Sequence, residues 1–227
     1  MPTPYIHDEL FEPNDITDVD IYETCGGKIV IVDNFYKHPD DINWMLSQAW
    51  AQDFKRGENS RNFKDYYDCR LTIENNRSFE DKAQQQIWTI IEQCFDDFKL
   101  VKKEEPLRFN LFKWINTPEQ SIQHYPHTDA WTKCAGIIYL DKHNQGGTAF
   151  YDVDGRTQIE DEIGYIEEQD LQVDIETLGY PYDVVPAEFN RLVLYPGWYM
   201  HGGFMTSHRT YTDNWRMNQV FFWDVNR

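Results

Sequence analysis

The sequence has few cysteines and no long apolar run. Its four cysteines, at positions 25, 69, 94 and 134, form no C-x-x-C pair, which excludes a zinc ribbon and a dense disulfide framework and fits a reducing compartment. The first residues show no basic region followed by an apolar core, so we read no signal peptide. No apolar segment approaches the length that a bilayer requires. We therefore expect a cytoplasmic protein with no membrane partner.

Basic residues are also scarce. The chain has 21 Lys and Arg residues against 39 Asp and Glu residues, which gives a formal net charge of -18. A negative field of this size repels phosphate backbones and anionic lipid surfaces. We therefore expect no nucleic-acid partner.

No internal repeat or low-complexity linker divides the chain, and its length suits a single domain over residues 1–227. We expect an irregular N-terminal arm over residues 1–27, with room for one short strand. A strand and supporting helices should follow over residues 28–106. The spacing of apolar residues predicts these helices over 39–51 and 78–99.

From residue 107 the sequence becomes a succession of short apolar runs, one of which stops at Pro196-Gly197. These runs cover residues 107–114, 135–140, 146–151, 190–197 and 215–223. Helical patterns thus come first and short strands follow. We expect a mainly β (α+β) fold, a double-stranded β-helix or jelly roll of about eight strands over residues 107–223, with the helices supporting one sheet from outside.

A metal-binding pattern lies among these strands. His127 and Asp129 stand two residues apart, so in a strand they point to the same side. His201 follows much later, after another apolar run. Two imidazoles and one carboxylate occupy three positions of an octahedral ion and leave three open, which is the facial triad of non-haem Fe(II) enzymes. The alternative is accidental spacing in an unrelated β protein, since a short H-x-D is common by chance.

The order H-x-D, a long gap, His and then Arg resembles the 2-oxoglutarate/Fe(II)-dependent dioxygenase superfamily. The segment Gly146-Gly147-Thr148-Ala149-Phe150 is similar to its prolyl-hydroxylase-like branch, including bacterial and phage members. The resemblance covers roughly residues 28–223 and is most specific over residues 124–222.

The resemblance implies an enzyme that uses Fe(II), O2 and the co-substrate 2-oxoglutarate to hydroxylate a substrate, with release of succinate and CO2. It also implies that His127, Asp129 and His201 hold the iron. Asp129 favours hydroxylation over halogenation, because halogenating relatives lack this carboxylate. The substrate partner stays open among a free amino acid, a peptidyl residue and another small molecule.

The far carboxylate of 2-oxoglutarate requires a cation inside the barrel. Arg216 lies in the apolar terminal strand, where an unpaired charge is expensive, so its burial would imply a buried anion. Arg209, in a polar loop, is the second candidate. Asn218, two residues after Arg216, lies where the superfamily places a second polar contact.

The chain departs from the branch at one position. Many members have a tyrosine three residues before the first histidine, hydrogen-bonded to 2-oxoglutarate, whereas this chain has His124 there and Tyr125 one residue later. Asn110 or Tyr139, on neighbouring strands, could make the same bond.

Residues 152–183 form an acidic insertion with eleven Asp and Glu residues against one basic residue. It fits a solvated surface segment or a lid that selects a cationic or polar substrate. Two other functions stay open for the chain. One is a cupin-like metalloenzyme that uses the triad without 2-oxoglutarate, and the other is a non-catalytic jelly-roll binding domain. A buried Arg216 discriminates against the cupin-like enzyme, which gives the arginine no anion to hold.

Overall fold

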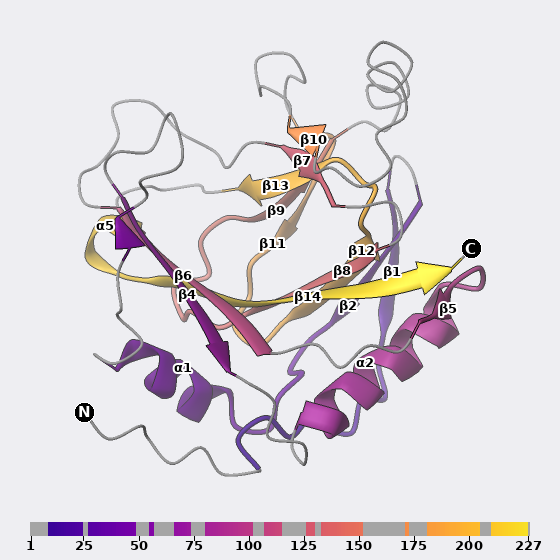
Figure 1. Ribbon diagram of the computed structural model, residues 1–227, viewed down its shortest axis with the longest axis horizontal. Helices are drawn as coiled ribbons and strands as arrows, with labels where there is room; N and C mark the ends of the chain where they lie inside the picture. The colour runs from indigo at the N-terminus through magenta and orange to yellow at the C-terminus, as the bar shows by residue number, and fades with distance from the viewer. Residues whose placement is uncertain are drawn as a thin grey trace.

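The structure is a computed structural model that describes residues 9–24, 27–48, 55–56, 66–73, 80–101, 107–114, 126–129, 133–151, 171–172, 181–204 and 210–226. Two antiparallel sheets form its centre, and two helices lie beneath the larger sheet (Figure 1). None of the described helices is long and apolar enough to cross a membrane.

The larger sheet has nine strands, in the order β1-β2-β12-β8-β14-β6-β4-β3, with β5 paired to β14. Their bounds are β1 (Asp20–Thr24), β2 (Gly27–Val32), β3 (Lys55–Arg56), β4 (Tyr66–Ile73), β5 (Lys99–Leu100), β6 (Leu107–Trp114), β8 (Lys133–Tyr139), β12 (Leu192–Pro196) and β14 (Arg216–Asn226). The smaller sheet has five strands, in the order β10-β7-β13-β9-β11. These are β10 (Leu171–Gln172), β7 (His127–Thr128), β13 (His201–Phe204), β9 (Gly147–Phe150) and β11 (Asp183–Pro186).

The strands after residue 107 pass back and forth between the two sheets. β6, β8, β12 and β14 belong to the larger sheet, and β7, β9, β11 and β13 belong to the smaller one. This path is that of a double-stranded β-helix, so the predicted jelly roll of about eight strands is confirmed. The short strand β10 comes from within the acidic insertion and pairs with β7.

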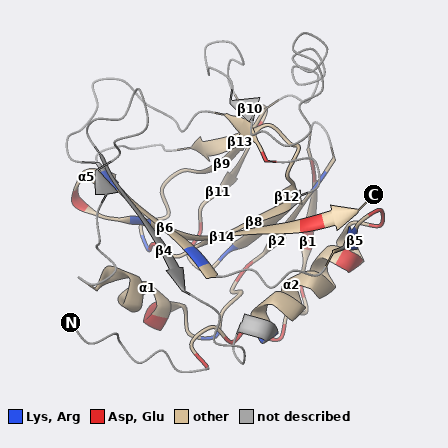
Figure 2. Cartoon of the chain, in the orientation of Figure 1, with Lys and Arg blue, Asp and Glu red and all other residues tan. Residues whose placement is uncertain are grey.

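Alternation along the strands of the larger sheet separates two apolar layers. On β12, Leu192 and Leu194 belong to the outer layer, whereas Val193 and Tyr195 face the smaller sheet. The outer layer is covered by helices α1 (Pro39–Ser47) and α2 (Glu80–Cys94), as predicted (Figure 1). Many charged residues lie in the loops between the elements, and β9, β12 and β13 carry none (Figure 2).

The predicted helix bounds are too long at both C-terminal ends. α1 ends at Ser47 instead of residue 51, because Gln48 is extended (φ -71°, ψ 149°) and its N–H bonds to the Met45 carbonyl. α2 ends at Cys94 instead of residue 99. After it the chain makes a turn, in which the Phe98 N–H donates a hydrogen bond to the Phe95 carbonyl at 3.0 Å. The predicted start at residue 78 lies outside the described residues.

The N-terminal arm packs against the outer layer. Phe11 is fully buried, and its ring lies 5.8 Å from Phe109 on β6 and 6.1 Å from Tyr36 (centroid distances). The one short strand expected there is β1, which pairs with β2.

Candidate metal centre

The smaller sheet brings the three predicted metal ligands together. His127 lies on β7 with Asp129 just beyond it, and His201 begins β13 directly opposite His127 in the antiparallel register. One ligand atom from each residue lies within 4.8 Å of the others, and no other such group of three occurs among the described residues. The jelly-roll path thus brings to one point residues that are far apart in sequence.

The interatomic distances fit a shared divalent ion. An Asp129 carboxylate oxygen lies 4.0 Å from His127 Nε2, and the other lies 3.5 Å from His201 Nε2. Atoms that bind one ion at about 2.1 Å lie at most about 4.2 Å apart. Two imidazoles with one carboxylate are the donor set that suits Fe(II). The residues present therefore fit the metal that the sequence predicts.

His201 is held in the form that binds metals. Its Nδ1 lies 2.8 Å from the Tyr199 carbonyl oxygen. Because a carbonyl can only accept, Nδ1 carries the proton and the Nε2 lone pair is left for a ligand. Burial, and next the neighbouring His127, hold the pKa of His201 well below its usual range, against the effect of the Tyr199 carbonyl. The ring is thus neutral at physiological pH.

Arg216 is a buried guanidinium at the start of β14, with 5% of its surface exposed. Its Nη2 donates to the Gly147 carbonyl at 3.3 Å, and its Nε has no hydrogen-bond partner. No carboxylate of the described residues forms an ion pair with it. Arg209, the second candidate, lies outside the described residues.

Three of the predicted co-substrate residues form one row across the larger sheet. Asn218 on β14 pairs with Asn110 on β6 and with Tyr139 on β8, so all three side chains share the face toward the smaller sheet. The Asn218 amide oxygen is buried without a hydrogen-bond partner. Tyr139 is also buried, and its hydroxyl lies 2.6 Å from the Thr148 hydroxyl. Tyr125, the remaining candidate, lies outside the described residues.

A second buried charge near Arg216 was missed by the sequence analysis. Asp141 is 3% exposed and accepts hydrogen bonds from the His143 N–H at 3.1 Å and the Tyr211 hydroxyl at 3.3 Å. Burial raises the pKa of Asp141, and the nearby Arg216 opposes that rise. Asp141 follows an apolar strand in a turn-forming stretch, so nothing in the sequence separates it from the exposed acidic residues.

An aromatic wall beside His201 was also missed. The ring of Tyr195 lies 4.6 Å from the His201 ring and 5.1 Å from that of Phe150, both nearly edge-on. Burial, and next the neighbouring Asp129 carboxylate, raise the pKa of Tyr195 well above its usual value. Tyr195 belongs to an apolar run, whose pattern indicates a strand but not a position at a metal site.

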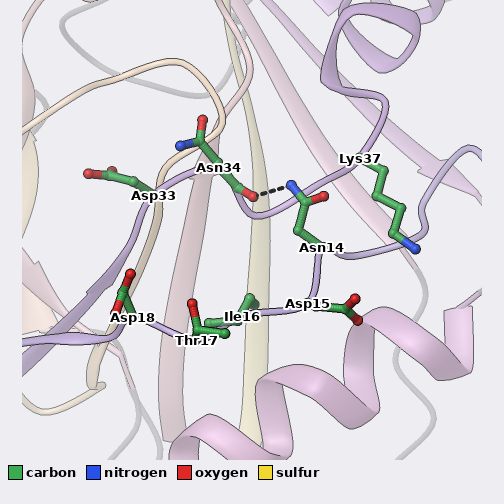
Figure 3. A pocket seen from close by; sticks show the side chains of 8 residues that line it. All are labelled: Asn14, Asp15, Ile16, Thr17, Asp18, Asp33, Asn34 and Lys37. Carbon is green, nitrogen blue, oxygen red and sulfur yellow. Dashed lines mark hydrogen bonds between the residues drawn. The ribbon is translucent and has the colours of Figure 1, made fainter.

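A separate pocket of about 380 Å³ lies between the arm and the loop that follows β2 (Figure 3). Its lining includes three carboxylates, those of Asp15, Asp18 and Asp33. They do not converge as the triad does, and Asp33 is bound by Arg191 at 2.6 and 3.0 Å. This pocket is therefore not the metal centre.

Solved structures with similar folds include proteins that bind a metal ion and 2-oxoglutarate. The epimerase SnoN, in complex with Fe3+, α-ketoglutarate and nogalamycin RO, has a TM-score of 0.54 at 14% identity, over 89% of this chain and 79% of that one. HygX from Streptomyces hygroscopicus, with nickel, 2-oxoglutarate and hygromycin B bound, has a TM-score of 0.50 at 9% identity, over 89% and 83%. A Pseudomonas putida prolyl-4-hydroxylase has a TM-score of 0.47 at 12% identity, over 88% and 92%. The comparison with curated proteins gives no significant match.

At these identities the likeness establishes the fold alone, the double-stranded β-helix that this chain shares with those structures. The resemblance found in the sequence is confirmed at this level. Residues 14–217 match the model of a family described as of unknown function, DUF6445. The chain belongs to that family.

Proposed function

We propose that the protein is an Fe(II)- and 2-oxoglutarate-dependent oxygenase that hydroxylates an amino-acid, peptidyl or small-metabolite substrate. The observation that carries the proposal is the pairing of two features in one barrel. A two-histidine, one-carboxylate group is accompanied by a buried arginine that forms no ion pair with the described residues. When bound, the iron supplies the redox chemistry that joins O2 to 2-oxoglutarate and substrate, with release of succinate and CO2.

In this proposal His127, Asp129 and His201 hold the iron. The Tyr199 carbonyl fixes the His201 tautomer, so that Nε2 is ready as a ligand without loss of a proton. Asp129 contributes the negative charge that a divalent ion requires.

Arg216 binds the far carboxylate of 2-oxoglutarate. Its Nε has no hydrogen-bond partner, and its Nη2 donates to the Gly147 carbonyl. The remaining N–H groups of the guanidinium can bind a carboxylate through two parallel hydrogen bonds. Glycine is required at position 147 because a Cβ there would lie 2.0 Å from the Val185 carbonyl oxygen on the neighbouring strand β11. Asn218 supplies a further polar contact, and Asn110 and Tyr139 flank it on either side.

An anaerobic titration tests this function. Fe(II) is added to the apoprotein, and 2-oxoglutarate is then added while the weak visible metal-to-ligand charge-transfer band is followed. We expect a band that saturates with 2-oxoglutarate and is absent from Asp129→Ala. Iron binding without any effect of 2-oxoglutarate would favour the cupin-like metalloenzyme. If the protein binds neither, the non-catalytic binding domain becomes the better function.

A further inference from the structure

Four of the buried tyrosines, Tyr36, Tyr139, Tyr195 and Tyr211, differ in how their hydroxyl groups are used. Three of them make hydrogen bonds to protein groups: Tyr36 to the Gln219 side-chain oxygen at 2.7 Å, Tyr139 with Thr148 at 2.6 Å, and Tyr211 to the Gln145 carbonyl at 3.0 Å. Tyr195 is slightly more exposed, at 6% against 0–1% for these three, and its hydroxyl bonds to none of the described residues. The Tyr195 hydroxyl is not among the fully buried polar atoms that lack a partner, so a water or a small ligand can reach it. A hydroxyl that no protein group binds is left to bond with such a molecule.

The ring of Tyr195 is fixed beside the metal centre. It lies on the face of β12 that looks toward the smaller sheet, 4.6 Å from the His201 ring at an interplanar angle of 60°. Phe150 packs on it at 5.1 Å and 82°. The strand partner of Tyr195 on β8 is Ala135, whose small side chain leaves the ring in place between these two neighbours. The ring thus has a packing role that a phenylalanine would keep.

From this geometry we infer that the Tyr195 hydroxyl donates a hydrogen bond to an oxygen ligand of the bound metal. This inference rests on the proposed function for the identity of the metal site. A phenol donates well to a negatively charged oxygen, and bonds to charged acceptors are stronger than those between neutral groups. A carboxylate oxygen of 2-oxoglutarate presents such an acceptor, and a metal-bound water presents a weaker, neutral one. Tyr195 would therefore supply a tyrosine hydroxyl to 2-oxoglutarate, in a chain that has His124 three residues before its first metal ligand.

The test compares Tyr195→Phe with Tyr36→Phe, which removes a buried hydroxyl from the outer layer. Thermal unfolding of the apoproteins is measured first. Tyr36→Phe should lower the midpoint, because Gln219 loses its partner, whereas Tyr195→Phe should leave it unchanged or raise it. Fe(II) affinity is then measured anaerobically, followed by 2-oxoglutarate affinity at saturating Fe(II).

We expect Tyr195→Phe to weaken 2-oxoglutarate binding by about tenfold, as for a lost bond to a charged group, with Fe(II) binding within twofold of wild type. Weakened Fe(II) binding alone would assign the bond to a metal-bound water. The inference is overturned if both affinities equal those of the wild type, or if Tyr36→Phe weakens them as much. Should the wild type bind Fe(II) but not 2-oxoglutarate, the proposed function fails, and the Fe(II) titration alone decides the role of Tyr195.

Discussion

The two faces of the larger sheet are built for different purposes. The outer face is sealed by α1, α2 and the N-terminal arm around a continuous apolar layer. The polar side chains at its centre are neutral: Tyr36 donates to Gln219, and the Gln219 Nε2 and the Trp223 Nε1 are buried without a hydrogen-bond partner. The inner face holds a guanidinium and an amide, those of Arg216 and Asn218, with buried atoms that have no hydrogen-bond partner. It also holds the Tyr195 hydroxyl, which bonds to none of the described residues.

This contrast separates stability from binding. Apolar burial on the outer face contributes directly to the free energy of unfolding. A buried charge without an ion pair works against that free energy unless a ligand completes it. Substitutions on the outer face should therefore lower stability and leave ligand affinity intact, and substitutions on the inner face should do the reverse.

The largest expected effect is on the outer face. Phe109→Ala removes a fully buried ring that packs on Phe11, and it should lower the free energy of unfolding by about 3–5 kcal/mol. Urea denaturation followed by circular dichroism measures this change. Fe(II) affinity of the folded variant should stay within twofold of wild type. A parallel loss of affinity would show that the two faces are not independent.

Next in size is Arg216→Ala on the inner face. The variant should weaken 2-oxoglutarate binding by about 2–5 kcal/mol, as expected when one partner of a buried charge pair is truncated. Fe(II) binding should be unchanged. Succinate formation across a 2-oxoglutarate titration gives the affinity, with Arg209→Ala and Arg191→Ala as controls. If Arg209→Ala is the damaging variant, the family of reaction stands but the arginine is wrong.

Much of this contrast could be read from the sequence, because periodicity reports directly on which face a residue occupies. The H-x-D pair and the strands at residues 135–140 and 190–197 follow local rules, so the triad and the jelly roll were predictable. Arg216 stood out because a charge within an apolar strand conflicts with its surroundings.

The roles of Tyr195 and Asp141 could not be read in the same way. A tyrosine in an apolar run fits either side of a sheet, and only the packing of β12 against β9 and β13 places Tyr195 beside His201. Asp141 is one of 39 acidic residues, and its burial depends on α5 (Thr210–Asp213), far along the chain. The helix ends were misplaced because extended backbone at Gln48 leaves no mark on apolar spacing.

A smaller effect should separate the members of the polar row. Asn218→Ala removes an amide from the centre of the inner face and should weaken 2-oxoglutarate binding by about 1 kcal/mol, the usual contribution of one hydrogen bond. Asn110→Ala removes the same group from the neighbouring strand, where the side chain is only half-buried, and should have less effect. Isothermal titration with 2-oxoglutarate at saturating Fe(II) compares the two. The reverse order would place the co-substrate closer to β6 than to β14.

The smallest effect concerns Asp141, and it appears as a dependence of stability on pH. Its carboxyl has a pKa raised above the ordinary value of 3.8, mainly by burial, so the folded state holds the proton more tightly than the unfolded chain. The stability that this group contributes is therefore complete below about pH 3.8 and is lost as the pH rises through the raised folded pKa. Asp141→Asn keeps an acceptor for the Tyr211 hydroxyl but has no proton to lose. Over that pH window the wild type should lose unfolding free energy relative to Asp141→Asn. Above the window the difference between the two proteins should stay constant. Urea denaturation of both proteins at a series of pH values measures the difference, and a difference that is constant throughout would mean that Arg216 fully compensates the buried carboxylate.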